Sequence, residues 1–197
     1  MKIYFDGCSW TWGGELEDNE TERFSAIISK EMGAEEHNFS RPMASNDRIL
    51  RQLLIDNNIK EYDMAIIQMS YPSRTEYYDE SKKEFVRVGI NVTPLWKPNK
   101  PKWHKYWDDK DKQFWFHYYS SVYNEHYGTT KENIIFQNIK DHCKAHDVPL
   151  FLMTINNWDS NLNFNLELER DRYPKARGGH PNADGHKLIA SDILRLL

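Results

Sequence analysis

The stretch "DMAIIQMS" (63–70) decides the fold class of this chain. It is a continuous apolar run of the length of one strand, and Pro72 lies just beyond it. A run without alternation of apolar and polar residues is typical of a strand that is buried on both faces of a parallel sheet. We therefore expect 63–70 to be the central strand of an α/β protein.

Strand-like and helix-like patterns alternate on both sides of this stretch. The expected strands are 2–5, 36–39, 63–70 and 148–155, and the expected helices are 22–32, 45–56, 131–146 and 182–197. Alternation of this kind favours helices packed on both faces of one sheet. The sequence therefore predicts one domain, 1–197, that folds as a three-layer α/β/α sandwich around a flavodoxin-like, mainly parallel sheet.

Residues 71–130 do not fit this alternation, because aromatic residues there are interleaved with Lys, Asp and Pro. A loop of this length in a compact domain is usually a lid or a binding element. We interpret it as an insertion after the third strand. Two interpretations stay open: a small satellite core that stabilises its own loop, or a platform on which sugar rings stack.

Composition excludes several classes of partner. The net charge of the 197 residues is −4 and no long block of like charge occurs, so neither nucleic acid nor an anionic membrane is expected to bind. Two cysteines, Cys8 and Cys143, are too few for a disulfide framework and are interpreted as free thiols. The first residues, MKIYFDGCSW, are not expected to form a signal peptide, and the sequence has no apolar run of membrane-spanning length. A soluble protein, cytoplasmic or virion-associated, is expected.

Candidate functional residues follow from the sheet. In an open parallel sheet the ligand lies beyond the carboxyl ends of the strands. This rule selects residues 6–9, 41–46, 70–74 and 156–158, and His180 enters from the loop before the last helix. A serine near the amino end and a histidine near the carboxyl end then become neighbours, as base-activated nucleophilic attack requires.

Four blocks of the sequence resemble the conserved blocks of one family, the SGNH/GDSL hydrolases. They are "FDGCSWTWGG" (5–14), "NFSRPMASNDRI" (38–49), "IIQMSYPSR" (66–74) and "GGHPNADGHKLIA" (178–190). The resemblance covers both ends and the sheet core, leaving out the insertion. It implies that Ser9 is the nucleophile, that His180 is the general base and that the backbone amide of Ser9 is one oxyanion donor. No metal or organic cofactor is implied.

The chain departs from the family pattern at three places. Met43 or Ala44 stands where the second block has glycine. Ser70 stands where the third block has an asparagine that donates to the oxyanion; serine is a weaker donor, unless Asn46 from the neighbouring loop takes over this role. Arg177 occupies the position three residues before the histidine, where the family has aspartate, and a guanidinium cannot accept the imidazole proton. The group that orients His180 is then Asp171, a backbone carbonyl, or none.

Other residues have simpler interpretations. The side chain of Cys8 is expected to point away from that of Ser9 and to pack in the core, although a thiol nucleophile is the alternative. Arg74 follows the third strand and could hold a substrate carboxylate. His142 and His146 flank Cys143 at helical spacing, but a zinc site would need another ligand, so a solvated helix edge is expected. His186 is expected on the surface of the last helix.

The sequence thus predicts an SGNH-type serine esterase that removes an acyl group from a carbohydrate or a small ester, and the expected acyl group is acetyl. Two other hypotheses remain. One is a binding or structural module, such as a virion component, that keeps the fold with weakened catalysis; the departures at Met43, Ser70 and Arg177 favour it. The other is a sugar acyltransferase, which uses the same residues and differs in what excludes water.

Overall fold

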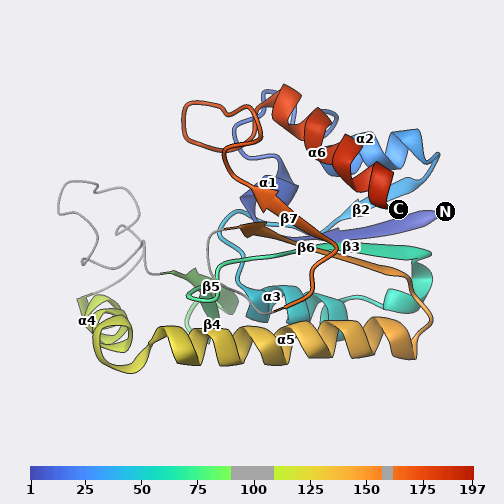
Figure 1. Cartoon of the computed structure of the whole chain (residues 1–197). Helices are drawn as coiled ribbons and strands as arrows, with labels where there is room; N and C mark the ends of the chain where they lie inside the picture. The colour runs from blue at the N-terminus through green and yellow to red at the C-terminus, as the bar shows by residue number, and fades with distance from the viewer. Residues whose placement is uncertain (90–108, 157–161) are drawn as a thin grey trace.

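The computed structural model describes residues 1–89, 109–156 and 162–197 of the chain. A five-stranded parallel sheet with the order β2-β1-β3-β6-β7 forms its centre (Figure 1). The strands are β1 (Lys2–Asp6), β2 (Glu35–Asn38), β3 (Met64–Met69), β6 (Leu150–Asn156) and β7 (Leu166–Glu169). The central strand is β3, as its apolar run predicts.

Helices cover both faces of the sheet (Figure 1). On one face lie α1 (Ser9–Trp12), α2 (Phe24–Glu31) and α6 (Ala183–Leu196), and on the other lie α3 (Asn46–Arg51) and α5 (Glu125–Ala145). A π-helical turn, η1 (Gln52–Asp56), continues α3, and a 3₁₀ turn, η2 (Ile59–Glu61), leads into β3. The predicted three-layer α/β/α sandwich is therefore confirmed.

The alternating side chains of the strands separate two hydrophobic cores. Ile66 packs with α2 and α6 on one face, and Ile67 packs with α3 and α5 on the other; both are fully buried. Successive residues of a strand point to opposite faces. A strand covered by helices on both faces is therefore apolar at nearly every position, which explains the run in β3. Its one polar residue, Gln68, is buried and accepts a hydrogen bond from Thr11.

His186 lies in the core, so its expected place on the helix surface is wrong. Its ring stacks on Phe24 at a centroid distance of 5.7 Å, and its Nδ1 accepts a hydrogen bond from the Phe24 amide at 3.2 Å. The cause is the packing of α6 against α2, which buries the face of α6 that carries this histidine.

Part of the insertion forms regular structure that the sequence did not reveal. An antiparallel hairpin joins β4 (Thr75–Asp79) to β5 (Glu84–Val88), and a helix, α4 (Asp109–His117), leads through a π-helical turn, η5 (Tyr118–Val122), into α5. The Asn124 side chain caps α5 by accepting from the Tyr127 amide, so this helix begins before the expected residue 131. Residues 90–108 of the insertion lie outside the described part.

Aromatic residues of the insertion form a third, smaller core. Val88, Trp115 and Tyr119 are buried together, and Met43 from the main domain packs against them. The Tyr119 hydroxyl donates to the Ser73 carbonyl at 2.7 Å, which ties this core to the segment after β3. The satellite core is therefore present, while other rings of the insertion stay exposed, namely Tyr78, Phe85, Phe114, Phe116 and Tyr127.

Within the described ranges we find no helix that is both long enough and apolar enough to cross a membrane.

Candidate functional site

The first strand ends in a turn that presents Ser9. Gly7 separates Asp6 from Cys8, and Ser9 is the first residue of α1. A Cβ on Gly7 would lie 2.9 Å from the Gln68 Cβ, so only glycine lets this turn approach β3 so closely. The Thr11 hydroxyl then donates to Gln68 Oε1 at 2.7 Å and fixes α1 on the central strand.

Cys8 and Ser9 point in different directions. The thiol of Cys8 is buried, and its Sγ accepts a hydrogen bond from Gln68 Nε2 at 3.1 Å. Ser9 is only partly buried. The structure thus places Cys8 in the core, in keeping with a packing residue, and leaves the Ser9 hydroxyl at the surface of the site.

Three side chains from the two ends of the chain form a hydrogen-bonded row. The Ser9 Oγ lies 2.9 Å from His180 Nε2, and His180 Nδ1 lies 2.8 Å from Glu15 Oε2. Glu15 also accepts from the backbone amides of Gly178, at 2.7 Å, and His180, at 3.1 Å. Ser9 and His180 are therefore neighbours, as expected, and a carboxylate contacts the other ring nitrogen of His180.

The row fixes the arrangement of protons. An ionised carboxylate accepts hydrogen bonds and donates none, and the hydrogen bonds from His180 lower the pKa of Glu15 below its usual value. Nδ1 of His180 therefore carries the proton. The lone pair of Nε2 is left facing the Ser9 hydroxyl, as a general base requires.

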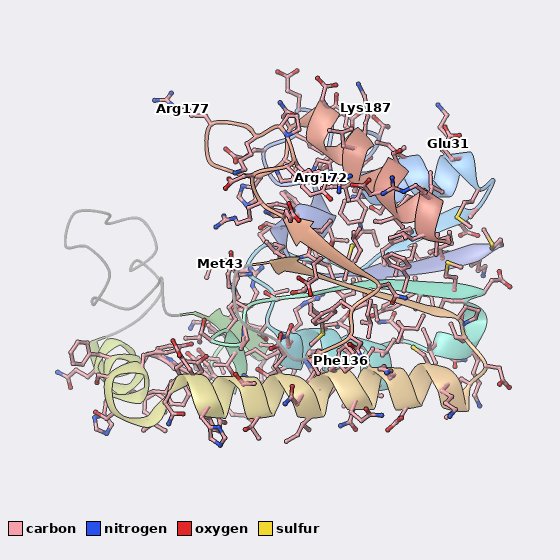
Figure 2. All side chains as sticks on the ribbon, in the orientation of Figure 1. Glu31, Met43, Phe136, Arg172, Arg177 and Lys187 are labelled. Atoms are coloured by element: carbon pink, nitrogen blue, oxygen red, sulfur yellow. The ribbon has the colours of Figure 1, made fainter. Side chains whose placement is uncertain are left out.

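Asp171 is not the carboxylate on the imidazole. Its side chain is fully exposed and pairs with Lys175, four positions along the chain, at 2.7 Å. Arg177 is exposed as well, at the tip of a loop, and its side chain points away from the molecule (Figure 2). The prediction of Asp171 was wrong: Asp171 is close to His180 in sequence but pairs with Lys175, and the carboxylate that contacts His180 comes from Glu15, 165 positions away.

The loop of the second block lies beside the Ser9 turn. The Arg41 amide donates to the Gly7 carbonyl at 3.2 Å. Met43, at the edge of the sheet in Figure 2, has a φ of 61°. This is the left-handed region that glycine adopts without strain. Met43 thus keeps a backbone conformation suited to the glycine that the resemblance places here.

Asn46 and Ser70 hold each other rather than standing free. The Asn46 side chain donates to the Ser70 carbonyl at 2.9 Å and accepts from the Ser70 amide at 2.6 Å, and both residues are buried. The Ser70 Oγ accepts from Arg74 at 2.9 Å, so its own proton remains able to donate. Of the two predicted oxyanion donors, the Asn46 amide is thus tied to the end of β3.

Arg74 lies where the main domain meets the insertion. Its guanidinium stacks on Tyr71 at 4.8 Å from the ring centre. A Cβ on Gly89 would lie 3.4 Å from the Arg74 Cγ and 4.0 Å from the Met43 Cε, so these three residues meet at one place. The insertion therefore borders the predicted oxyanion side of the site.

A buried ion pair supports the turn from below. Arg48 on α3 donates to the Asp6 carboxylate at 2.9 Å and to the Phe39 carbonyl. Asp6 is fully buried. Burial raises the pKa of Asp6 to about 6, although Arg48 and the Gly7 amide act in the opposite direction. The pair joins the end of β1, the loop after β2 and the start of α3.

The remaining candidates do not form a second chemical site. The rings of His142 and His146 are in edge contact at 4.7 Å, and among the residues with described positions no group of three potential metal ligands occurs. Residues 157 and 158 lie outside the described ranges.

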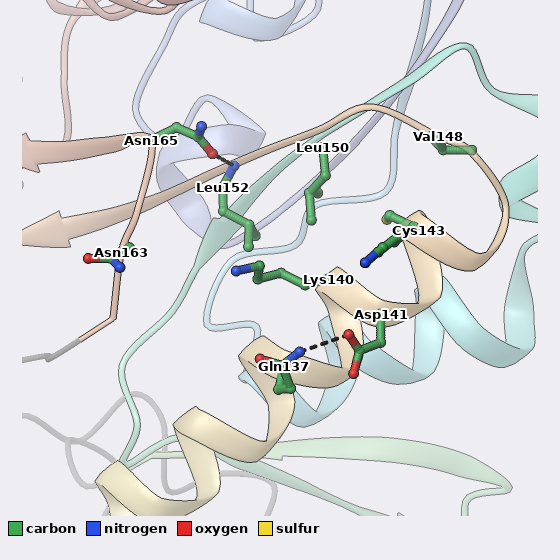
Figure 3. Close-up of a pocket in the computed structure, with 10 residues that line it drawn as sticks. Gln137, Lys140, Asp141, Cys143, Val148, Leu150, Leu152, Asn163 and Asn165 are labelled. Atoms are coloured by element: carbon green, nitrogen blue, oxygen red, sulfur yellow. Dashed lines mark hydrogen bonds between the residues drawn. The ribbon is translucent and has the colours of Figure 1, made fainter.

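A cavity of about 480 Å³ lies between α5 and the segment that leads to β7 (Figure 3). Gln137, Lys140 and Asn163 line it with apolar residues, and none of its lining residues belongs to the Ser9 site.

Glu15 is the site residue that sequence reasoning missed. A signal was present: the pair Gly13-Gly14 precedes Glu15, and the pair Gly178-Gly179 precedes His180. A Cβ on Gly14 would lie 3.1 Å from the Ser9 carbonyl and 3.3 Å from the His180 ring. Paired glycines at both ends of the chain thus mark two loops that pack tightly on each other.

No family model and no curated protein matches this sequence. Solved structures do resemble it in fold. They include an acetyl xylan esterase, AlAXEase, with 13% identity, full coverage of both chains and a TM-score of 0.55. The psychrotrophic esterase EstA from Pseudoalteromonas sp., in a structure inhibited by monoethylphosphonate, has 11% identity, covers 98% of this chain and 94% of its own, and gives a TM-score of 0.54. A lipase from a goat rumen metagenome has 11% identity, coverage of 100% and 97%, and a TM-score of 0.51.

Proposed function

We propose that this chain, which has the fold of the SGNH/GDSL hydrolases, is a serine esterase with Ser9 as nucleophile and His180 as general base. The observation that carries the proposal is the 2.9 Å contact between Ser9 Oγ and His180 Nε2. This contact joins residues 171 positions apart at the edge of the sheet where ligands bind in parallel α/β folds. The esterases and the lipase with the same fold support the proposal.

The reaction follows from this geometry. Ser9 Oγ attacks the ester carbonyl while its proton passes to His180 Nε2, and the carbonyl electron pair moves onto oxygen. The same proton then leaves with the alcohol, so that an acyl group remains on Ser9. A water molecule, deprotonated by His180, hydrolyses this acyl-enzyme and restores the serine.

The oxyanion needs donors close to Ser9. We assign the backbone amides of Ser9 and Met43, with the Ser70 hydroxyl as a third donor, while Asn46 holds Ser70 in place. The first amides of a helix have no partner within the helix, and the Cys8 side chain does not cap α1. Each such donor stabilises the oxyanion by roughly 3 to 4 kcal/mol.

The substrate that we propose is an acetyl ester of a carbohydrate or of another small alcohol. Support comes from the acetyl xylan esterase with the same fold and from the exposed aromatic rings of the insertion. Arg74, where the insertion meets the Ser9 site, would hold a substrate carboxylate.

Acyl transfer to a sugar is the alternative reaction, and it uses the same acyl-enzyme. It is tested by adding a sugar or methanol as acceptor and measuring the new ester.

The test is hydrolysis of p-nitrophenyl acetate together with labelling by a fluorophosphonate. The wild type is expected to turn over the ester and to carry the label on Ser9. In Ser9→Ala and in His180→Ala, kcat is expected to fall by about 10³-fold or more, because removal of either group abolishes base-activated attack. Label is expected to disappear in Ser9→Ala.

Cys8→Ala is the matched control, since it removes the neighbouring nucleophile and should keep both label and turnover. A wild type that neither hydrolyses the ester nor labels would refute the esterase and favour the binding module. Full labelling of Ser9→Ala would refute the assignment of the nucleophile.

A further inference from the structure

Glu15 holds both the ring and the backbone of the His180 loop. One carboxylate oxygen accepts from the Gly178 amide, and the other accepts from the His180 amide and lies 2.8 Å from Nδ1. A surface glutamate that merely paired with a histidine would need one of these contacts. The three contacts together hold both the imidazole ring and the backbone of its loop against one carboxylate.

Two glycines make room for this arrangement. A Cβ on Gly178 would lie 2.6 Å from the Glu15 carboxyl carbon, which is shorter than the van der Waals contacts that real Cβ atoms make. A Cβ on Gly14 would press on the His180 ring and on the Ser9 carbonyl. The sequence thus excludes side chains from both positions where they would separate Glu15, His180 and Ser9.

The backbone of Glu15 is also unusual. Its φ is 70°, in the left-handed region, directly after the turn in which Gly13 ends α1 with a φ of 84°. A residue other than glycine adopts this conformation only at a cost in free energy. The contacts to the His180 loop offset this cost and direct the side chain across the site.

We propose that Glu15 is the positioning acid of the site, in the role that the family pattern gives to the residue three positions before the histidine, here Arg177. The inference rests on the proposed function. As the Ser9 proton arrives on Nε2, Nδ1 keeps its own proton, and the ionised Glu15 stabilises the imidazolium without taking a proton. The order along the chain becomes serine, glutamate, histidine, with the acid six residues after the nucleophile.

Glu15→Gln separates this role from a merely structural one. The amide keeps one oxygen, which can still accept from the Gly178 amide, so part of the brace for the loop would survive. Its NH₂ group can instead donate to Nδ1, which favours the tautomer with the proton on Nε2 and removes the lone pair that faces Ser9. Catalysis and structure therefore respond differently.

The first measurement is kcat and KM for p-nitrophenyl acetate, with thermal unfolding as a check of folding. In Glu15→Gln we expect kcat to fall by about 10² to 10⁴-fold, as for other triad acids, with KM within about threefold and an unchanged melting temperature. Glu15→Asp, with its shorter side chain, is expected to recover part of the loss. The controls Glu17→Gln and Asp171→Asn remove exposed carboxylates and should leave kcat unchanged.

The second measurement needs no turnover. Nitrogen-15 NMR of the histidine rings distinguishes a proton on Nδ1 from one on Nε2. We expect neutral His180 to carry it on Nδ1 in the wild type and on Nε2 in Glu15→Gln. A wild type without activity would refute the proposed function alone, and this spectrum would still decide the role of Glu15. Unchanged kcat in an active Glu15→Gln variant, an unchanged tautomer, or a loss of kcat in Asp171→Asn instead would overturn the inference.

Discussion

The contact between Glu15 and His180 requires a residue without a side chain at position 178. The φ of Gly178 is not in the left-handed region, so the backbone at this position accepts any residue, and the need for glycine comes from the Glu15 carboxylate alone. The neighbour that a Cβ would meet is the far end of a flexible side chain. A substitution here can therefore disturb the site without unfolding the protein.

Gly178→Ala is expected to push the Glu15 carboxylate off the imidazole. We expect kcat for p-nitrophenyl acetate to fall by at least about tenfold, because the loss of the positioning acid in a triad costs up to about 10⁴-fold. The melting temperature should change by less than about 2 °C. Arg177→Ala, at the exposed neighbouring position, is the control and should retain full activity. Equal activity of both variants would contradict the close approach of Glu15 to Gly178.

At the scale of elements, the Asp6–Arg48 pair joins β1 to α3. Both side chains are buried, with exposed fractions of 0 and 8%. Removal of one partner of a buried pair leaves an uncompensated charge, whereas removal of both does not. The pair thus makes the end of β1, and with it the Ser9 turn, dependent on α3.

Arg48→Met is expected to lower the free energy of unfolding by about 3 to 5 kcal/mol at neutral pH. The double variant Asp6→Asn, Arg48→Met should recover most of this loss, because no buried charge remains. Urea denaturation at pH 7.5 measures both. Equal stability of the single and double variants would show that the pair does not shield a buried charge.

At the scale of the whole molecule, two buried groups give the stability of the fold opposite dependences on pH. Burial lowers the pKa of His186 to about 4 from 6.5, so the unfolded chain takes up a proton there before the folded chain does, and stability is lost as the pH falls from 6.5 towards 4. Burial raises the pKa of Asp6 to about 6 from 3.8, so the folded chain takes up its proton first, and stability is gained as the pH falls through 6. The two effects partly cancel.

His186→Asn isolates the histidine, because the asparagine oxygen can still accept from the Phe24 amide but does not titrate. Between pH 7.5 and pH 5 the wild type should lose about 2 kcal/mol of unfolding free energy relative to the variant. Urea denaturation of both proteins at the two pH values gives this difference. Parallel pH profiles would contradict a His186 that is neutral in the folded state.

The sheet and its layers could be predicted because long apolar runs and helical spacing repeat along the chain. β7 could not, since "LELE" is a short edge strand whose alternation resembles many exposed segments. The hairpin β4–β5 and the start of α5 could not be predicted, because the aromatic residues are spread through the whole insertion without a clear period of two or of 3.6. Burial of His186 depended on which face of α6 meets α2, and a single polar residue does not reveal that.

The same limit applies to the site. Ser9 and His180 could be predicted because each lies in a recognisable block at the edge of the sheet. Glu15 could not, since its role depends on a contact between loops that are 165 positions apart. The side-chain partners of Asn46 and Ser70 were likewise invisible, because both follow from how α3 meets the end of β3.

The placement of this row along the chain also bears on protein synthesis. Ser9 and Glu15 leave the ribosome early and close together, whereas His180 is translated 165 residues after Glu15. In the proposed mechanism, the serine until then has no base to activate it, and the carboxylate has no imidazole to orient. Under the proposed mechanism, a nascent or truncated chain that ends before His180 is therefore expected to lack esterase activity at Ser9.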